Sequence, residues 1–435
     1  MYPFAAYVLR KYHELTGWNE DFYSKLTRSS TAILDFDVPH GVNFAISKSP
    51  TPLFKTTYTL QALPTLHGSL GYIFTSCPLD VGGSHVVPFD ELLSRFKIYG
   101  PPKRPEGKEE EWLAGQRVDT RDYLLYGRLY VPASRVEALY SIRLTPTLQG
   151  TIAAISEPGR FGVRPPPRYG APVTRSNLLF GLEHDIGRWC TEYSYSAEDG
   201  MWGTRVLHHF GRLAGEASSE KKELGEGEKR VDEEDPMPGG LRGRFSAGAE
   251  VYFSAKEKSL GVSTGVRFTT LPDATPPSIT QNHPPMLTSS SQPPTTITAT
   301  FNPMMGQFSG AYAARVSRDL TLCSRYDFNM YSYESDWAMG AEWWMRRSKV
   351  RQLAPVQEDN ELPVMTLPSP AVEVEEDEIQ GVVKARIGTD ASVSLMWEGR
   401  LRNTLISLGV LSNLASPTKP IVNIGVELAY FSSDE

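Results

Sequence analysis

The stretch "IVNIGVELAYF", residues 421–431 near the end of the chain, decides the fold. Its residues alternate between two kinds of side chain. The apolar set is Val422, Ile424, Val426, Leu428 and Tyr430, and the intervening set is Asn423, Gly425, Glu427 and Ala429. A period of two is typical of a β-strand whose two faces meet different surroundings. The sequence therefore predicts a long, two-faced strand at this end of the chain.

The same alternation recurs through most of the sequence. It is present in "VNFAIS" (42–47), "FSAGAEVYFSA" (245–255) and "LTLCSRYDFNM" (320–330), where the second face is small, polar or charged. We predict about 19 strands of roughly 10 residues, the first over 33–48 and the last over 419–431. Any one such strand also fits a soluble β protein, but a long series with few helices between favours a membrane barrel.

Closure of the predicted sheet follows from its surroundings. Unpaired N–H and C=O groups cost several kcal/mol each in hydrocarbon, so a sheet that crosses a bilayer must close into a barrel. Its apolar face then meets lipid, and polar residues such as Glu427 face a wet lumen. Aromatic residues at strand ends are expected to form girdles at the two membrane interfaces. The candidates are Tyr123, Tyr130, Tyr140, Tyr331 and Trp337.

The predicted organisation is a helix followed by one barrel. An amphipathic helix is expected over residues 1–20 and the barrel over 30–431. The helix could lie in the lumen or on the membrane surface, and the lumen is favoured. Four polar insertions, expected to be mobile, each follow an odd-numbered strand and so leave one end of the barrel. They are residues 77–120, 212–240, 271–293 and 348–378.

Composition narrows the range of functions. The net charge is −7, so no global basic field indicates a nucleic acid partner. No run of 18 apolar residues provides a transmembrane helix. The "EHD" at 183–185 cannot converge on a metal, since neighbouring side chains of a strand point to opposite faces. We predict no enzymatic activity, catalytic residue, metal or cofactor. The N-terminus does not have the pattern of a secretory signal, which points to an organelle outer membrane.

The C-terminal strand also carries a recognisable signal. "NIGVELAY" (423–430) fits the mitochondrial β-signal, with Asn423, Gly425, Leu428 and Tyr430 at the motif positions. Other matching stretches are "GSLGYIFTS" (68–76), "RYDFNMYSYESDWAMGAEWW" (325–344) and the opening "MYPFAAYVLRKYHELTGW". Over nearly its whole length the chain resembles the mitochondrial distribution and morphology protein 10 family of fungi.

The resemblance implies a eukaryotic-porin-like barrel of about 19 strands, in which an odd count makes the first and last strands parallel neighbours. It implies a multi-pass protein of the mitochondrial outer membrane that anchors the ER–mitochondria encounter structure, supporting phospholipid exchange, mitochondrial morphology and inheritance. It also implies help in assembling β-barrel proteins and the import translocase with the sorting and assembly machinery. The expected partners are lipid-transfer and membrane-anchor subunits, the barrel-assembling core, translocase subunits and membrane lipids. The alternative is a metabolite or ion channel of the VDAC kind.

Two pairs of outward aromatic residues are candidate partner-binding sites. Tyr72 and Phe74 share one face of a predicted strand, as do Tyr326 and Phe328. Large rigid aromatic side chains are efficient interface anchors, and the resemblance supports these positions. Ordinary lipid-facing aromatics would give the same pattern, so both interpretations stay open.

Overall fold

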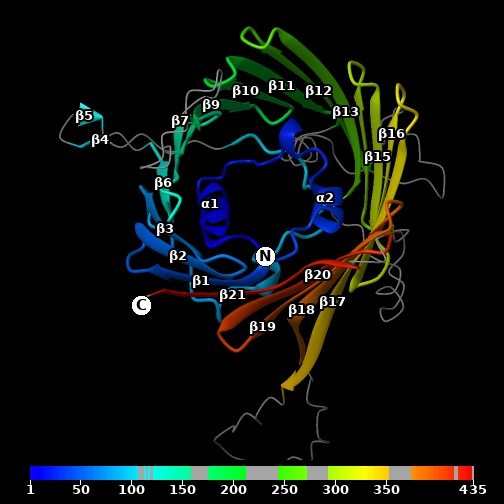
Figure 1. Cartoon of the computed structure of the whole chain (residues 1–435). Coiled ribbons are helices and arrows are strands. Elements are labelled where there is room, and N and C mark those ends of the chain that lie inside the picture. Colours follow the sequence, from blue (N-terminus) through cyan, green and yellow to red (C-terminus); the bar gives the residue numbers. More distant parts are fainter. Residues whose placement is uncertain are drawn as a thin grey trace, which may run out of the picture.

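The chain folds into a closed 19-stranded barrel with a layer of helices and extended chain inside it (Figure 1). The computed structural model describes residues 1–105, 112–113, 116–117, 121–157, 175–211, 243–271, 292–351, 374–415 and 420–433. None of the described helices is long and apolar enough to cross a bilayer.

Most strands of the barrel wall have 8 to 13 residues, as the period-two pattern predicts. They are β1 (Gly41–Ser49), β2 (Phe54–Leu63), β3 (His67–Thr75), β6 (Tyr123–Val131), β7 (Val136–Thr145), β8 (Leu148–Glu157), β9 (Arg175–Asp185), β10 (Trp189–Ser196), β11 (Met201–His209), β12 (Gly243–Ser254), β13 (Ser259–Thr270), β14 (Thr295–Asn302), β15 (Gln307–Arg315), β16 (Leu320–Asn329), β17 (Ser335–Arg351), β18 (Val374–Gly388), β19 (Ser392–Leu401), β20 (Thr404–Asn413) and β21 (Ile421–Ser433). The two-residue strands β4 (Trp112–Leu113) and β5 (Gln116–Arg117) pair with each other apart from the wall.

Consecutive wall strands pair antiparallel, and the barrel closes where β1 and β21 run parallel. In this seam Gly41 lies opposite Gly425, and the register continues to Ser49 opposite Ser433. The parallel seam confirms the prediction for an odd number of strands. We call the end of the barrel at which β21 ends the C-terminal rim. The other end is called the opposite rim.

The two faces of the wall differ as the alternation predicts. On β21 the side chains of Val422 and Ile424 are exposed on the outside, while Glu427 lines a cavity inside. Apolar residues dominate the outer face of other strands as well, for example Phe245, Val251 and Phe253 on β12. One girdle assignment is wrong, because Tyr130 points into the lumen. Its hydroxyl donates to Glu137 Oε2 at 2.9 Å.

The lumen contains three short helices from the N-terminal segment. These are α1 (Phe4–Leu15), η1 (Tyr23–Lys25) and α2 (Arg28–Leu34), and α1 and α2 lie within the ring of strands (Figure 1). The N-terminal helix therefore lies in the lumen, the location that the sequence favours over the membrane surface. The first predicted strand, 33–48, begins too early. Ile33 and Leu34 belong to α2, where they pack against the inner wall at Ala313, Cys323 and Ala338.

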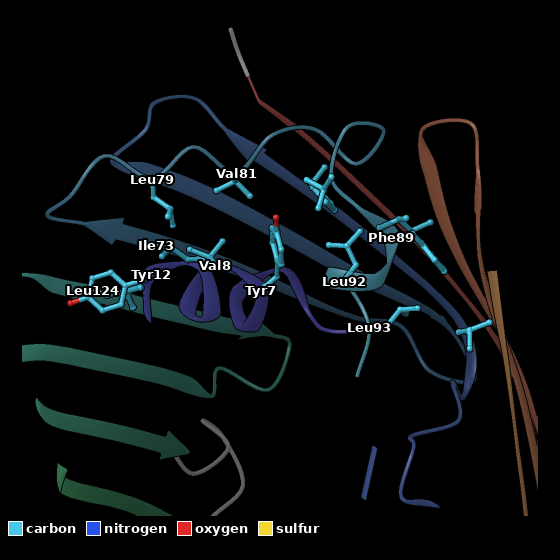
Figure 2. Close-up of a cluster of buried hydrophobic side chains, with 14 of the residues drawn as sticks. Tyr7, Val8, Tyr12, Ile73, Leu79, Val81, Phe89, Leu92, Leu93 and Leu124 are labelled. Atoms are coloured by element: carbon cyan, nitrogen blue, oxygen red, sulfur yellow. The ribbon is translucent and has the colours of Figure 1, made fainter. Parts of the chain in front are cut away.

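The first predicted insertion, 77–120, is only partly a separate polar segment, because its first part is packed inside the barrel. Leu79, Val81, Leu92 and Leu93 are buried in one cluster with α1. Figure 2 shows the side chains of Tyr7, Val8 and Tyr12 from α1 beside those of this connection, with Ile73 of β3 and Leu124 of β6 behind. Residues 1–35 and 77–99 are together called the inner layer below.

The long connections leave the barrel at both rims. Those after β3, β11, β13 and β17 start from the C-terminal rim, as predicted from the odd strand numbers. β8 ends at Glu157 and β9 begins at Arg175 at the opposite rim, where the sequence pattern predicts no long insertion. The predicted insertion 212–240 and most of 271–293 lie outside the described residues. So does most of 348–378, although β17 and β18 extend into its two ends.

Candidate docking surfaces and the inner layer

Tyr72 and Phe74 point outward from β3 near the C-terminal rim, with 45% and 36% of their surfaces exposed. The pairing register places other aromatic rings beside them. Phe54 of β2 stacks on Tyr72 with ring centroids 5.8 Å apart, and Tyr123 of β6 lies 6.2 Å from Phe74. Tyr123 in turn contacts Tyr140 of β7. The predicted pair is thus part of an aromatic surface that crosses four strands, called the β3 patch.

Tyr326 and Phe328 point outward from β16, and their rings stack nearly parallel at 6.5 Å. Tyr326 lies directly opposite Trp337 of β17 in the register, and Phe328 lies opposite Phe308 of β15. The Trp337 indole donates to Ser324 Oγ at 2.8 Å, which fixes the orientation of its ring. These rings form a second outward surface, called the β16 patch.

The structure does not bring the two patches together. β3 and β16 lie on opposite walls of the barrel (Figure 1). β3 runs toward the C-terminal rim and β16 runs away from it, so Phe74 and Phe328 lie near opposite rims. One partner of ordinary size could therefore not cover both patches. If both dock proteins, they dock different ones or different parts of a large assembly.

The four residues of the predicted β-signal are divided between the two faces of β21. Asn423 and Gly425 face the lumen, and Leu428 and Tyr430 face outward. The Asn423 amide donates to Val38 O at 3.4 Å, and its side-chain oxygen contacts His40 Nδ1. The backbone of Pro39 lies so close to Gly425 that a Cβ there would overlap its carbonyl group. The lumenal half of the signal therefore contacts the segment that leads into β1.

Charged residues tie the inner layer to the wall. Arg267 of β13 donates to Asp21 Oδ2 at 2.6 Å, with the side chains only 1% and 6% exposed. Arg325 of β16 binds Asp35 at 2.6 Å, and the buried ammonium of Lys384 donates to Ala32 O at 3.0 Å. Removing a charge from water is costly unless it is paired, so these contacts fix the inner layer in one position.

Comparison with known proteins assigns the chain. A family model described as mitochondrial distribution and morphology protein 10 matches residues 1–371 and 367–433. Proteins of that name from Postia placenta and Laccaria bicolor are 60% and 59% identical, and the similarity covers all of both chains. One from Cryptococcus neoformans var. neoformans is 40% identical over 99% of this chain and all of its own length. The chain belongs to this family.

Membership in the mitochondrial distribution and morphology protein 10 family assigns the barrel to mitochondria. The chain is a mitochondrial protein with a role in mitochondrial distribution and morphology.

The described residues hold no group of three or more His, Cys, Asp or Glu that could bind a metal. Glu183 and Asp185 face the lumen, where Glu183 accepts a hydrogen bond from the Trp18 indole at 3.1 Å.

Several residues of the site were not identified from the sequence. Phe54 and Phe308 complete the two patches, yet they lie on neighbouring strands whose register the pattern does not reveal. Trp337 is predicted from the sequence only as a girdle residue, and the register places it in the β16 patch. Asp21 and Arg267 are 246 positions apart, and neither occurs in a motif. A family alignment of covarying positions is the signal that could find such pairs.

Glu20 lies between α1 and α2 and contacts His13, Lys25 and Arg28. These contacts make the stability of the fold depend on pH. Burial opposes its ionisation, but the hydrogen bond to His13 and the charges of Lys25 and Arg28 outweigh it. They hold the pKa of Glu20 below its ordinary value of 4.5. A lowered pKa stabilises the fold above the unfolded-state pKa, and this stabilisation is lost as pH falls toward the folded-state value.

We therefore expect the melting temperature of the wild-type protein in detergent to fall as pH is lowered below about 4.5. The Glu20→Gln variant should already be less stable at pH 7 and should lose less on acidification. Thermal melts between pH 7 and pH 3 measure the difference. Equal pH dependence of the two proteins would contradict the role assigned to Glu20.

Proposed function

We propose that this protein is a docking scaffold embedded in the mitochondrial outer membrane, where two partner assemblies bind opposite sides of its barrel. One is the ER–mitochondria encounter structure, which the barrel anchors. The other is the sorting and assembly machinery, which it assists in assembling barrel proteins and the import translocase. Family membership supports the mitochondrial setting.

Membrane insertion is supported by the outer face of the wall. Exposed apolar residues occur on nearly every strand, for example Ile46 on β1, Leu178 on β9 and Leu395 on β19. A bilayer takes tilted strands of roughly 9–11 residues, close to the lengths of these strands. The proposed location is tested by alkaline carbonate extraction of mitochondria. The protein should remain in the membrane pellet, and release into the supernatant would exclude an integral barrel.

The observation that carries the scaffold proposal is the separation of the β3 and β16 patches. Exposed aromatic clusters with a fixed geometry are suited to binding protein partners, because Tyr, Trp and Phe bury a large area with little loss of side-chain entropy. Two such surfaces near opposite rims allow one barrel to belong to two assemblies. The inner layer agrees with this role, since it occupies space that a wide solute pathway needs.

We expect each double variant to lose one set of partners and keep the other. Tyr72→Ala/Phe74→Ala and Tyr326→Ala/Phe328→Ala are compared by pull-down in mild detergent and by photo-crosslinking from the four positions. Each aromatic anchor contributes about 2 kcal/mol or more at a hot spot, so recovery of the affected partners should fall at least tenfold. Tyr193→Ala/Phe253→Ala is the matched control, because both rings are exposed on the outer wall away from the patches.

One result of these experiments would exclude docking at the two patches. If both patch variants recover the same partners as the control, and the four positions crosslink only to lipid, then the aromatic rings are ordinary lipid contacts.

A metabolite or ion channel of the VDAC kind is the second candidate. It is favoured by the space that remains beside the inner layer, a cavity of about 660 Å³ between the first residues and the inner wall of β1, β2 and β3. Planar-bilayer recordings separate the two functions. A stable, ion-selective open state of the wild-type protein supports the channel, and a low conductance supports the scaffold.

A further inference from the structure

Four cationic side chains meet around a small cavity within the inner layer. Arg10 comes from α1, Arg28 from α2, and Arg95 and Lys97 from the connection after β3. The cavity has a volume of about 210 Å³. It is also lined by Trp18 and Tyr99 and by the carboxylates of Glu14, Glu20 and Asp21. The chain therefore gathers positive charge from three separate segments at one point in the lumen.

The carboxylates near this cavity do not balance its cations. Asp21 is already bound by Arg267 of the wall. The four lining cations then face three carboxylates: Arg10, Arg28, Arg95 and Lys97 against Glu14, Glu20 and Asp90. A single carboxylate, Glu20, is shared by Arg28 and Lys25. The site keeps an excess of positive charge.

Lys97 makes no ion pair with any described residue. Among the described residues, no carboxylate lies within ion-pair distance of Lys97, in contrast to Arg10, Arg28 and Arg95. Arg95 pairs with Asp90 at 2.8 Å through Nη2. Lys97 is exposed as a whole residue, but partial burial of its ammonium and the positive charges of Arg10, Arg28 and Arg95 lower its pKa, although Glu14 opposes this. An anion in the cavity would compensate these charges.

We propose that this cavity binds the phosphate group of a small soluble anion, either inorganic phosphate or a phosphomonoester. Guanidinium groups match phosphate oxygens with paired N–H donors, and a lysine adds a mobile point charge. The cavity has the volume of about seven water molecules, which suits a phosphate group and a small substituent. A lipid headgroup carries the same chemistry, but the lumenal position behind the barrel wall favours a ligand from the aqueous phase. The proposal is independent of the docking function.

The test uses the full-length protein in detergent and inorganic phosphate as the probe, at constant ionic strength with chloride as the reference anion. Lys97→Gln removes the unpaired cation, and Lys103→Gln removes an equal charge from a lysine that is also exposed but lies outside the cavity lining. Isothermal calorimetry should show saturable phosphate binding to the wild type and to Lys103→Gln. Affinity should fall about tenfold or more in Lys97→Gln, as expected for the loss of a charge-assisted hydrogen bond.

Two controls keep the result interpretable. Because Lys97 makes no ion pair, both variants should melt at the wild-type temperature without phosphate, which shows that the fold is intact. Nanodiscs that contain phosphatidic acid but no free phosphate test the other source of the phosphate group. Absence of saturable binding to the wild type, equal affinity of the two variants, or binding of phosphatidic acid alone would each overturn the proposal.

Discussion

The Gly425→Ala variant is expected to fail to close its barrel. A Cβ at this position would lie 2.8 Å from the backbone nitrogen of Gly41 and closer still to the carbonyl group of Pro39. Both neighbours are backbone atoms, so neither can turn aside as a flexible side chain would. They also belong to the segment that starts β1, the partner of β21 in the parallel seam. The added methyl group therefore pushes apart the two strands whose pairing completes the barrel.

The expected destabilisation is about 3 kcal/mol or more, at the upper end of the range for overpacking. Refolding of the urea-unfolded protein into detergent micelles measures it, with the folded fraction read from the heat-dependent shift on a gel. This assay contains no sorting machinery, so it separates packing at the seam from recognition of the β-signal. Gly127→Ala on β6 is the matched control, because a Cβ there meets no atom within 4 Å. If both variants refold to the same yield, Gly425 serves recognition alone.

The same glycine shows how far the sequence could lead. The alternation at 421–431 predicts which side chains of β21 face the lumen, and the structure confirms this for Glu427. It does not reveal that Pro39 would lie on Gly425, because that contact joins positions 386 residues apart. Periodicity describes a strand relative to its own axis, and it is silent on what covers either face.

The β3 connection illustrates a different limit. The charged run at 101–111 predicts a mobile insertion over all of 77–120. Its apolar residues, among them Leu79 and Leu93, have no helical or strand period, yet they are buried against α1. Such residues gain their partners only once the barrel encloses them. An average over composition cannot identify them.

Tyr130 is a case in which the sequence held enough information. It is seven positions from Tyr123 in one strand, and an odd separation places two residues on opposite faces. The prediction of both as girdle residues therefore conflicts with the strand period itself. The structure has Tyr123 in the outer β3 patch and Tyr130 in the lumen beside Arg128.

The second large effect is expected at the buried pair of Asp21 and Arg267. The Arg267 guanidinium also lies over the ring of Tyr99, 4.1 Å from its centroid, so the wall, the N-terminal segment and the β3 connection meet at this one group. Asp21→Asn leaves an almost fully buried guanidinium without its counter-charge. Loss of one partner of a buried pair costs about 3–5 kcal/mol, whereas removal of both is far less harmful.

We therefore expect Asp21→Asn and Arg267→Met each to lower the melting temperature strongly, and the double variant to recover most of the loss. Glu157→Gln is the control, since its pair with Arg135 is exposed and is worth at most about 1 kcal/mol. Additive losses in the double variant would show that the two residues act separately. Planar-bilayer recordings of the same proteins add a functional measure, because this pair holds the inner layer against the wall. A higher conductance in Asp21→Asn than in Glu157→Gln would mean that the inner layer, held in part by this ion pair, keeps the barrel from acting as a wide pore.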